Sequence, residues 1–245
     1  MRIEQRFMTN SIYYYIGVLQ RVVRLAINQG IIIKNPFGAF TRERTSSKRK
    51  YMTQEELDKF IRTTVTSKAL CHTRDMFIFS TFTGLAYADL CNFSVHHIHR
   101  EKNGSLWIRI KRQKTGVESI IRLLDIPLKI IDKYRNERTS DKVFNIKSLS
   151  TIEANLNRFA EKCGIEKRIT FHFSRHNFAT LITLSQGVPL ETVCKMMGHK
   201  NITTTQIYAK LTQQKVNEDM KLLRKRIDKK YTIAQAQFKA KDIQK

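Results

Sequence analysis

The chain has 245 residues, 41% of them hydrophobic, so it is long and apolar enough to bury a core, which excludes wholesale disorder. Its 45 lysine and arginine residues outnumber 21 aspartate and glutamate residues, giving a formal net charge of +24. This excess favours a nucleic acid as partner, because neutralising phosphates releases condensed counterions. Charge alone does not separate DNA from RNA. An anionic membrane surface is the weaker interpretation, since no isolated basic amphipathic segment stands out.

Cysteine usage and hydropathy indicate the compartment. The four cysteines, Cys71, Cys91, Cys163 and Cys194, are far apart and form no CxxC pair, which argues against structural zinc and for reduced thiols. No stretch approaches the roughly 20 apolar residues of a membrane span, and the N-terminus lacks the apolar run of a signal peptide. We therefore expect a cytoplasmic, nucleoid-associated bacterial protein with no membrane partner.

The N-terminal region predicts one amphipathic helix. Apolar side chains recur at spacings of four and three from Ile12 to Ala26, and Gly30 can end the helix. Asn35-Pro36 then forces an extended or turn conformation. Because a helix with one apolar stripe is not stable alone, this one needs a packing partner in the chain or outside it.

A polar, basic stretch without periodicity follows at residues 41–51, and we interpret it as an interdomain linker. It is either a solvated loop or a strap lying along phosphates. The strap interpretation makes five cations candidate DNA-binding residues: Arg42, Arg44, Lys48, Arg49 and Lys50.

A second domain begins with a capping box, Thr53-x-x-Glu56, which predicts the start of a helix. The remaining pattern predicts a helix over 70–83 that stops at Gly84, a strand pair at 106–110 and 120–124, a helix from Pro127, a short element at 143–144, and helices over 150–162, 174–186, 190–197 and 203–228. The fold class is therefore mainly α with a small antiparallel β-sheet (α+β).

Three segments carry candidate chemistry. His172 and Arg175 are three residues apart at a predicted helix start, where free N–H groups and a bidentate guanidinium suit a phosphate. Gly198 ends a helix and places His199 on a turn, and nine residues later Tyr208 can serve as a covalent nucleophile. Lys114 lies at a hairpin tip, exposed enough to enter a DNA groove. Each signal alone is weak.

The ordered set is more specific. Thr83-Gly84-Leu85, Lys114-Thr115, His172-x-x-Arg175, Gly198-His199 and Tyr208 follow one another as in the catalytic domain of tyrosine recombinases, which the chain closely resembles over roughly residues 50–215. The sequence of residues 83–90, TGLAYADL, resembles that of the branch carried by conjugative and mobilisable elements of Bacteroidetes. Residues 30–37 look like the end of the family's core-binding domain.

The resemblance implies four parts: a partial helical core-binding domain (1–40), a basic linker (41–51), a tyrosine recombinase catalytic domain (52–228) and a basic tail (229–245). It further implies a partner, double-stranded DNA, on which the family assembles as a homotetramer, with accessory DNA-bending proteins. The implied activity is a site-specific recombinase or integrase that integrates or excises a mobile element.

The resemblance also implies residue roles. Tyr208 would attack the scissile phosphate and form a 3′-phosphotyrosine link, while Arg175 and His172 hold the phosphate. Lys114 would protonate the leaving 5′ oxygen, and His199 would donate a hydrogen bond to the phosphate. Because the covalent link conserves the phosphodiester energy, the reaction needs no metal, ATP or other cofactor.

Two departures from the family matter. Its usual arginine is replaced by Ala86, and losing one such clamp typically costs about 3–4 kcal/mol, or roughly 10²–10³ in rate. We expect Arg112 to fill the gap, because it lies two residues before Lys114 at a strand end and residues two apart share a face. Arg74 and Arg109 are weaker candidates. The chain is also short, as if the family's arm-binding domain and the front of the core-binding domain were missing.

Three alternatives remain open. A recombinase relic that binds DNA without cutting it is favoured by Ala86 and by the short N-terminus. A type IB topoisomerase shares the chemistry but lacks site preference. A metallohydrolase built on His96, His97 and His99 is remote, because no carboxylate lies at ligand spacing beside them.

Overall fold

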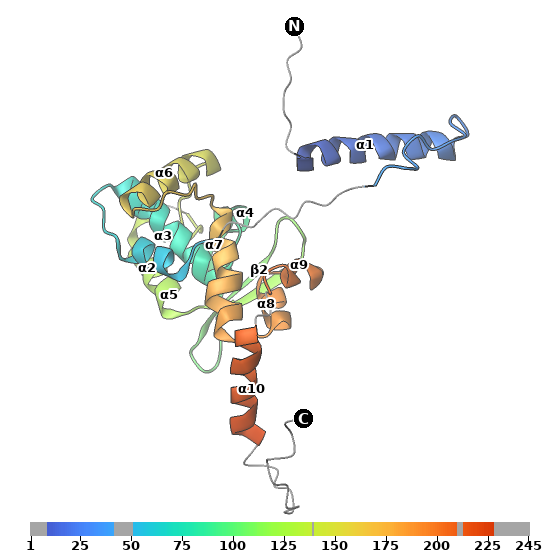
Figure 1. Cartoon of the computed structure of the whole chain (residues 1–245). Helices are drawn as coiled ribbons and strands as arrows, with labels where there is room; N and C mark the ends of the chain where they lie inside the picture. Colours follow the sequence, from blue (N-terminus) through green and yellow to red (C-terminus); the bar gives the residue numbers. More distant parts are fainter. Residues whose placement is uncertain (1–8, 42–50, 139, 210–212, 228–245) are drawn as a thin grey trace, which may run out of the picture. The chain divides into compact units, whose positions relative to one another are not determined.

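The computed structural model describes residues 9–41, 51–138, 140–209 and 213–227 (Figure 1). The chain divides into two compact units, Met1–Lys50 and Tyr51–Lys245. The five linker cations and the basic tail from residue 229 onward lie outside the described residues. No described helix is both long enough and apolar enough to cross a membrane.

The first unit consists of helix α1 (Thr9–Asn28) and the turns that follow it. The helix ends before Gly30, whose φ of 72° lies in the left-handed region, as the sequence predicts. The chain then turns back, and the ring of Phe40 contacts that of Tyr13 edge to face. No described side chain of this unit is buried, and Leu19, in the middle of the apolar stripe, is 51% exposed. The described part of this unit therefore leaves the apolar stripe of the helix uncovered.

The core of the second unit is helical. Helix α3 (Lys68–Thr83) packs against α5 (Asp125–Lys133) and α6 (Leu149–Lys162), and α2 (Gln54–Arg62) packs beside it (Figure 1). The predicted capping box is confirmed, since Thr53 and Glu56 each bond the other's backbone N–H. The rings of Phe60, Phe77 and Phe159 meet at the centre, with centroids 4.6–5.0 Å apart.

A three-stranded antiparallel sheet borders these helices. Its strands are β1 (Ile98–Arg100), β2 (Leu106–Lys111) and β3 (Glu118–Arg122), in the order β1-β2-β3, with Ile108 opposite Ile121. The predicted strand pair is confirmed. The sequence prediction missed β1, because three residues are too few to show alternation.

The remaining elements are helices and turns, and they correct one prediction from the sequence. They are α4 (Tyr87–Cys91), 3₁₀ turns at Val95–His97 and Arg135–Glu137, α7 (His172–Asn177) with a π-helix (Phe178–Thr183) and a 3₁₀ turn (Leu184–Gln186), α8 (Leu190–Met196), α9 (Thr203–Gln206) and α10 (Gln213–Ile227). The prediction of one helix over 203–228 was wrong. Helix α9 ends at Gln206, and residues 207–209 form a turn that holds Tyr208.

Candidate active site

Arg175 is the centre of the site. It lies in α7 and is 3% exposed. Its neighbour Ser174 bonds Ser80 of α3 at 2.6 Å, and the Ser80 hydroxyl lies 2.6 Å from the carbonyl of Leu85. This buried chain of hydroxyls fixes α7 against the loop that follows α3, so the backbone of Arg175 is held in place from two sides.

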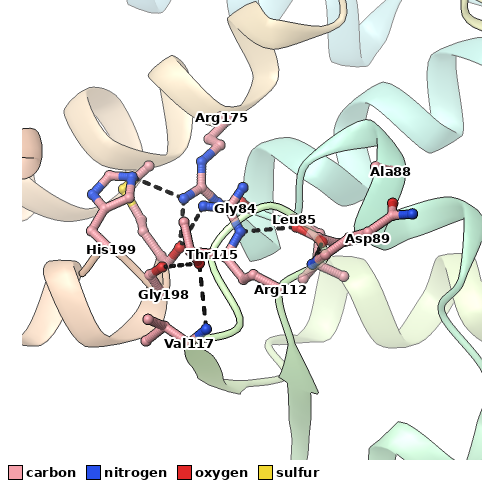
Figure 2. A network of polar contacts seen from close by, with 12 residues as sticks. Gly84, Leu85, Ala88, Asp89, Arg112, Thr115, Val117, Arg175, Gly198 and His199 are labelled. Carbon is pink, nitrogen blue, oxygen red and sulfur yellow. Dashed lines mark hydrogen bonds and ion pairs between the residues drawn. The ribbon is translucent and has the colours of Figure 1, made fainter. Parts of the chain in front are cut away.

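The loop after α3 contributes a carbonyl to Arg175. Nη1 of Arg175 donates to the carbonyl of Gly84, which has a φ of 69° (Figure 2). A Cβ at this position would lie 2.4 Å from the ring of Phe178. Only glycine therefore allows the left-handed turn and the close approach that brings this carbonyl to the arginine.

The turn after α8 contributes a second carbonyl. Met197 accepts from Nη2 of Arg175 at 2.5 Å and from Nη1 of Arg112 at 3.1 Å. Figure 2 shows the two guanidinium groups converging on this turn from different elements. Gly198, with a φ of 57°, passes so close over Arg112 that a Cβ would lie 2.7 Å from its Cδ atom.

Arg112 is buried in the site, but the reason given by the sequence was incomplete. It is 7% exposed and lies just past the end of β2, where the alternation of side chains no longer applies. Its Nε donates to Asp89 at 3.0 Å, and Asp89 also accepts from the backbone N–H of Gln113 at 2.9 Å. Lys114, two residues further on, is exposed, so the expectation that the two side chains share a face stays a prediction.

His199 bridges Arg175 and the segment that carries the tyrosine. Its Nε2 lies 3.0 Å from Nη2 of Arg175, and its Nδ1 lies 2.8 Å from the hydroxyl of Thr205. Burial, and after it the cations Arg175 and Arg112, lower the pKa of His199 to about 4 from 6.5. The imidazole is therefore neutral at pH 7.

Tyr208 lies in the turn after α9, next to two histidine rings. Its ring is stacked on that of His199 at a centroid distance of 6.4 Å, and it meets the ring of His176 at 5.1 Å. His176 in turn contacts His172 at 4.6 Å. Tyr208 is half-buried and packs against a small apolar cluster that includes Phe178. The structure thus brings His172, Arg175, His199 and Tyr208 into one place.

Lys114 belongs to the neighbouring turn. The hydroxyl of Thr115 donates to the carbonyl of Gly198 at 3.2 Å, which fastens the β2–β3 hairpin to the edge of the site (Figure 2). Lys114 itself is exposed on this hairpin. The weaker arginine candidates lie elsewhere: Arg74 pairs with Asp75 and Arg109 with Glu101.

The electrostatics of the site suit an anion. Burial, and after it the nearby Arg112 cation, lower the pKa of Arg175 to about 9 from 12.5, so Arg175 is still charged at pH 7. Two buried guanidinium groups therefore share one carbonyl, with the carboxylate of Asp89 beside Arg112. A phosphate placed here would relieve the repulsion between them.

Three residues that contact the site were missed by the sequence interpretation: Asp89, Thr205 and His176. Asp89 could have been noticed, because it is a carboxylate three residues after Ala86 in a very basic chain. Thr205 could not, because it stands in a run of three threonines and only the fold shows which one is buried. No group of three or more metal-ligating side chains occurs within the described ranges.

Comparison with known structures identifies the fold. The fold is that of a tyrosine recombinase catalytic domain. The integrase of transposon Tn1549 superposes with a TM-score of 0.70 over 90% of this chain and 81% of its own, at 18% identity. A lambda integrase superposes with a TM-score of 0.63 over 80% and 75%, at 21% identity.

The sequence comparison identifies the family. Residues 50–215 match the phage integrase family, which is more than half of the chain. The chain therefore belongs to the phage integrase family. Tyrosine recombinase XerA of Saccharolobus solfataricus is 38% identical over 53% of this chain and 42% of its own length. XerA of Pyrococcus furiosus is 30% identical over 69% and 60%. The chain thus spans about half the length of these curated relatives.

Proposed function

We propose that this chain is a site-specific DNA recombinase that breaks and rejoins DNA through a 3′-phosphotyrosine intermediate. The observation that carries the proposal is the convergence of Arg175 and Arg112 on the Met197 carbonyl beside His199 and the half-buried Tyr208. Family membership supports the same chemistry, and the neighbours of similar fold include integrases solved with DNA.

The proposed reaction is a transesterification in which each group has one task. The phenol oxygen of Tyr208 attacks the phosphorus, losing its proton to solvent, while the bond from phosphorus to the 5′ oxygen breaks. Lys114 gives its proton to that leaving oxygen and recovers one when the strands rejoin. Arg175, Arg112 and His172 stabilise the charge on the non-bridging oxygens, and His199 donates a hydrogen bond to them.

In this proposal, Arg112 replaces the arginine that the family usually has at the position of Ala86. Ala86 caps α4, two residues after the glycine whose carbonyl binds Arg175, so this loop still reaches the site without supplying a cation. Arg112 enters from the hairpin instead, and Asp89 orients it through its Nε.

The wider assignment extends the family resemblance of the sequence. We propose double-stranded DNA as the substrate, a homotetramer as the active assembly, accessory DNA-bending proteins as helpers, and integration or excision of a mobile element as the outcome. The sequence of residues 83–90 favours an element of the Bacteroidetes conjugative or mobilisable type. The linker cations and residues 1–40 would contact the DNA backbone around the cleavage site.

Covalent capture tests the proposal. Protein is mixed with nicked duplexes made from the DNA that flanks the gene, so that a cleaved strand diffuses away and traps the adduct. The wild type should form a covalent protein–DNA species, and Tyr208→Phe should form none while binding the same DNA, because only one hydroxyl is lost. An adduct with Tyr208→Phe would reject Tyr208 as nucleophile. DNA binding without any adduct from the wild type would favour the non-cleaving relic.

A further inference from the structure

The hydroxyl of Thr205 contacts a side chain outside its own helix. Thr83, Thr180 and Thr183 each donate their hydroxyl to a carbonyl four or five residues earlier in their own helix. Such bonds are the common solution for threonine in a helix. Thr205 is 0% exposed, and its hydroxyl instead lies 2.8 Å from Nδ1 of His199. This contact joins α9 to the turn after α8.

The contacts of His199 determine which ring nitrogen carries the proton. The guanidinium of Arg175 can only donate, so Nε2 of His199, 3.0 Å from it, must accept. In the neutral ring the proton then lies on Nδ1 and is donated to the hydroxyl of Thr205. The low pKa of His199, about 4, is consistent with a neutral ring. Without DNA, therefore, His199 points an acceptor at the centre of the site.

A phosphate requires the opposite arrangement. Its oxygens only accept, so His199 can bind one through Nε2 only when that nitrogen carries a proton. A hydroxyl is both a donor and an acceptor, and it changes role by rotating about the C–O bond. When phosphate binds, Nδ1 gives up its proton to water and Nε2 takes one up from water, so the ring stays neutral. The Thr205 hydroxyl accepts from Nδ1 before this exchange and donates to Nδ1 afterwards, while the imidazole keeps its position.

Thr205 also holds the nucleophile. The backbone N–H of Tyr208 donates to the carbonyl of Thr205 at 2.9 Å, and the Tyr208 ring lies parallel to that of His199, with 9° between the planes. One buried residue thus contacts the phosphate-binding histidine through its side chain and the tyrosine segment through its backbone.

We propose that Thr205 is a positioning residue that keeps His199 oriented in both of its proton states, so that the ring switches from acceptor for Arg175 to donor for the scissile phosphate. This rests on the proposed function, since the donor state is needed only if a phosphate enters the site. Thr205 does not touch the reacting atoms and acts through His199.

The test compares three variants of the full chain. Thr205→Val keeps the shape but has neither donor nor acceptor, and Thr205→Ser keeps the hydroxyl. Thr204→Val is the matched control, because Thr204 is exposed on the same helix. Thermal unfolding of each variant shows whether it is folded.

Nitrogen NMR of histidine-labelled, DNA-free protein reads the proton position directly, with His199→Gln identifying the His199 signals. Wild type, Thr205→Ser and Thr204→Val should show a protonated Nδ1 and a bare Nε2. Thr205→Val should shift part of the population to the form protonated on Nε2, because Nδ1 then has no acceptor and only the bond from Arg175 still favours a proton on Nδ1. A wild-type ring protonated on Nε2, or an unchanged spectrum for Thr205→Val, would overturn the proposal.

Covalent capture on the nicked duplex gives the second measurement. Thr205→Val should slow capture about 10- to 100-fold and leave DNA affinity unchanged, because the imidazole of His199 loses a hydrogen bond that orients it. Thr205→Ser should restore the rate to within about threefold. A wild-type rate for Thr205→Val would also overturn the proposal. If the wild type forms no adduct at all, the proposed function fails, and the NMR result alone decides the role of Thr205.

Discussion

Replacing Arg112 separates its structural role from its proposed catalytic one. Its partner Asp89 is 2% exposed, so Arg112→Met leaves a buried carboxylate whose remaining bond is to the N–H of Gln113. Breaking a buried ion pair by removing one partner costs about 3–5 kcal/mol. Replacing both partners, as in Arg112→Met with Asp89→Leu, removes the stranded charge. We expect the free energy of unfolding of that double variant to be only about 1–2 kcal/mol below that of the wild type, because the N–H of Gln113 is left without an acceptor.

Urea denaturation of the two single variants and the double variant measures this cycle. The structural interpretation requires the double variant to be more stable than Arg112→Met, by at least about 1 kcal/mol. If Arg112→Met is as stable as the wild type, the ion pair with Asp89 does not contribute as the geometry indicates. Arg109→Met is the matched control, because Arg109 forms an exposed ion pair with Glu101 and should change stability by less than about 1 kcal/mol.

Cleavage measures the catalytic role separately. Arg112→Lys keeps the charge but cannot reach Asp89 and the Met197 carbonyl together, so it should remain folded and yet cleave about 10²–10³-fold more slowly, with DNA affinity nearly unchanged. Adding Ala86→Arg should restore part of the rate, because it returns a cation to the loop beside Arg175. Normal cleavage by Arg112→Lys, or no rescue by Ala86→Arg, would contradict the compensation.

Three further predictions concern the rest of the chain. Changing Arg42, Arg44, Lys48, Arg49 and Lys50 to Gln should flatten the salt dependence of DNA binding, by about 0.9 in log affinity against log salt for each phosphate that the variant no longer neutralises; an unchanged slope would remove the strap interpretation. Deleting the residues after 212 should impair assembly on DNA if α10 docks on a neighbouring protomer, whereas unchanged tetramers would indicate docking in cis. The DNA-free protein should lose stability as the pH falls from 6.5 towards 4, because His199 binds a proton in the unfolded chain that its buried site rejects; His199→Gln should lose less over this window.

Local signals in the sequence predicted much of the fold. The capping box at Thr53 and the glycine stop at Gly84 depend on neighbouring residues only, and both occur where they were expected. Alternation predicted the β2–β3 pair for the same reason. The single helix over 203–228 was wrong because the threonines before Tyr208 give no helical stop signal that is visible without the rest of the fold.

The sequence predicted which residue types form the site, but it did not predict which side chains contact one another there. Arg175, His199 and Tyr208 meet as the family resemblance implies, whereas the low pKa of His199 depends on its burial and on Arg175 and Arg112 arriving from two different elements. The burial of Arg112 depends on Asp89, which is 23 residues away in sequence. Such pairs are set by tertiary packing, which a periodic pattern does not encode.

Gly198 shows how closely the backbone fits against the side chains of Arg112 and Ser119. An alanine there would adopt a φ of 57°, which costs about 1–2 kcal/mol, and its Cβ would lie 2.6 Å from Oγ of Ser119 and 2.7 Å from Cδ of Arg112. Because Ser119 is buried in β3 and Arg112 is held by Asp89, neither can move without loss. We therefore expect Gly198→Ala to displace Arg112 and to slow cleavage more than its loss of stability explains.

Gly164 provides the control for this substitution. Its φ is 68°, and a Cβ there would meet nothing within 4 Å, so Gly164→Ala carries the backbone strain without the steric overlap. Gly164→Ala should lose about 1–2 kcal/mol and cleave normally, while Gly198→Ala should lose more stability and most of its cleavage. Adding Ser119→Ala to Gly198→Ala removes one of the two overlaps, so it should recover stability but not cleavage. If that double variant regained full activity, the overlap with Ser119, and not the displacement of Arg112, would be the cause of the defect.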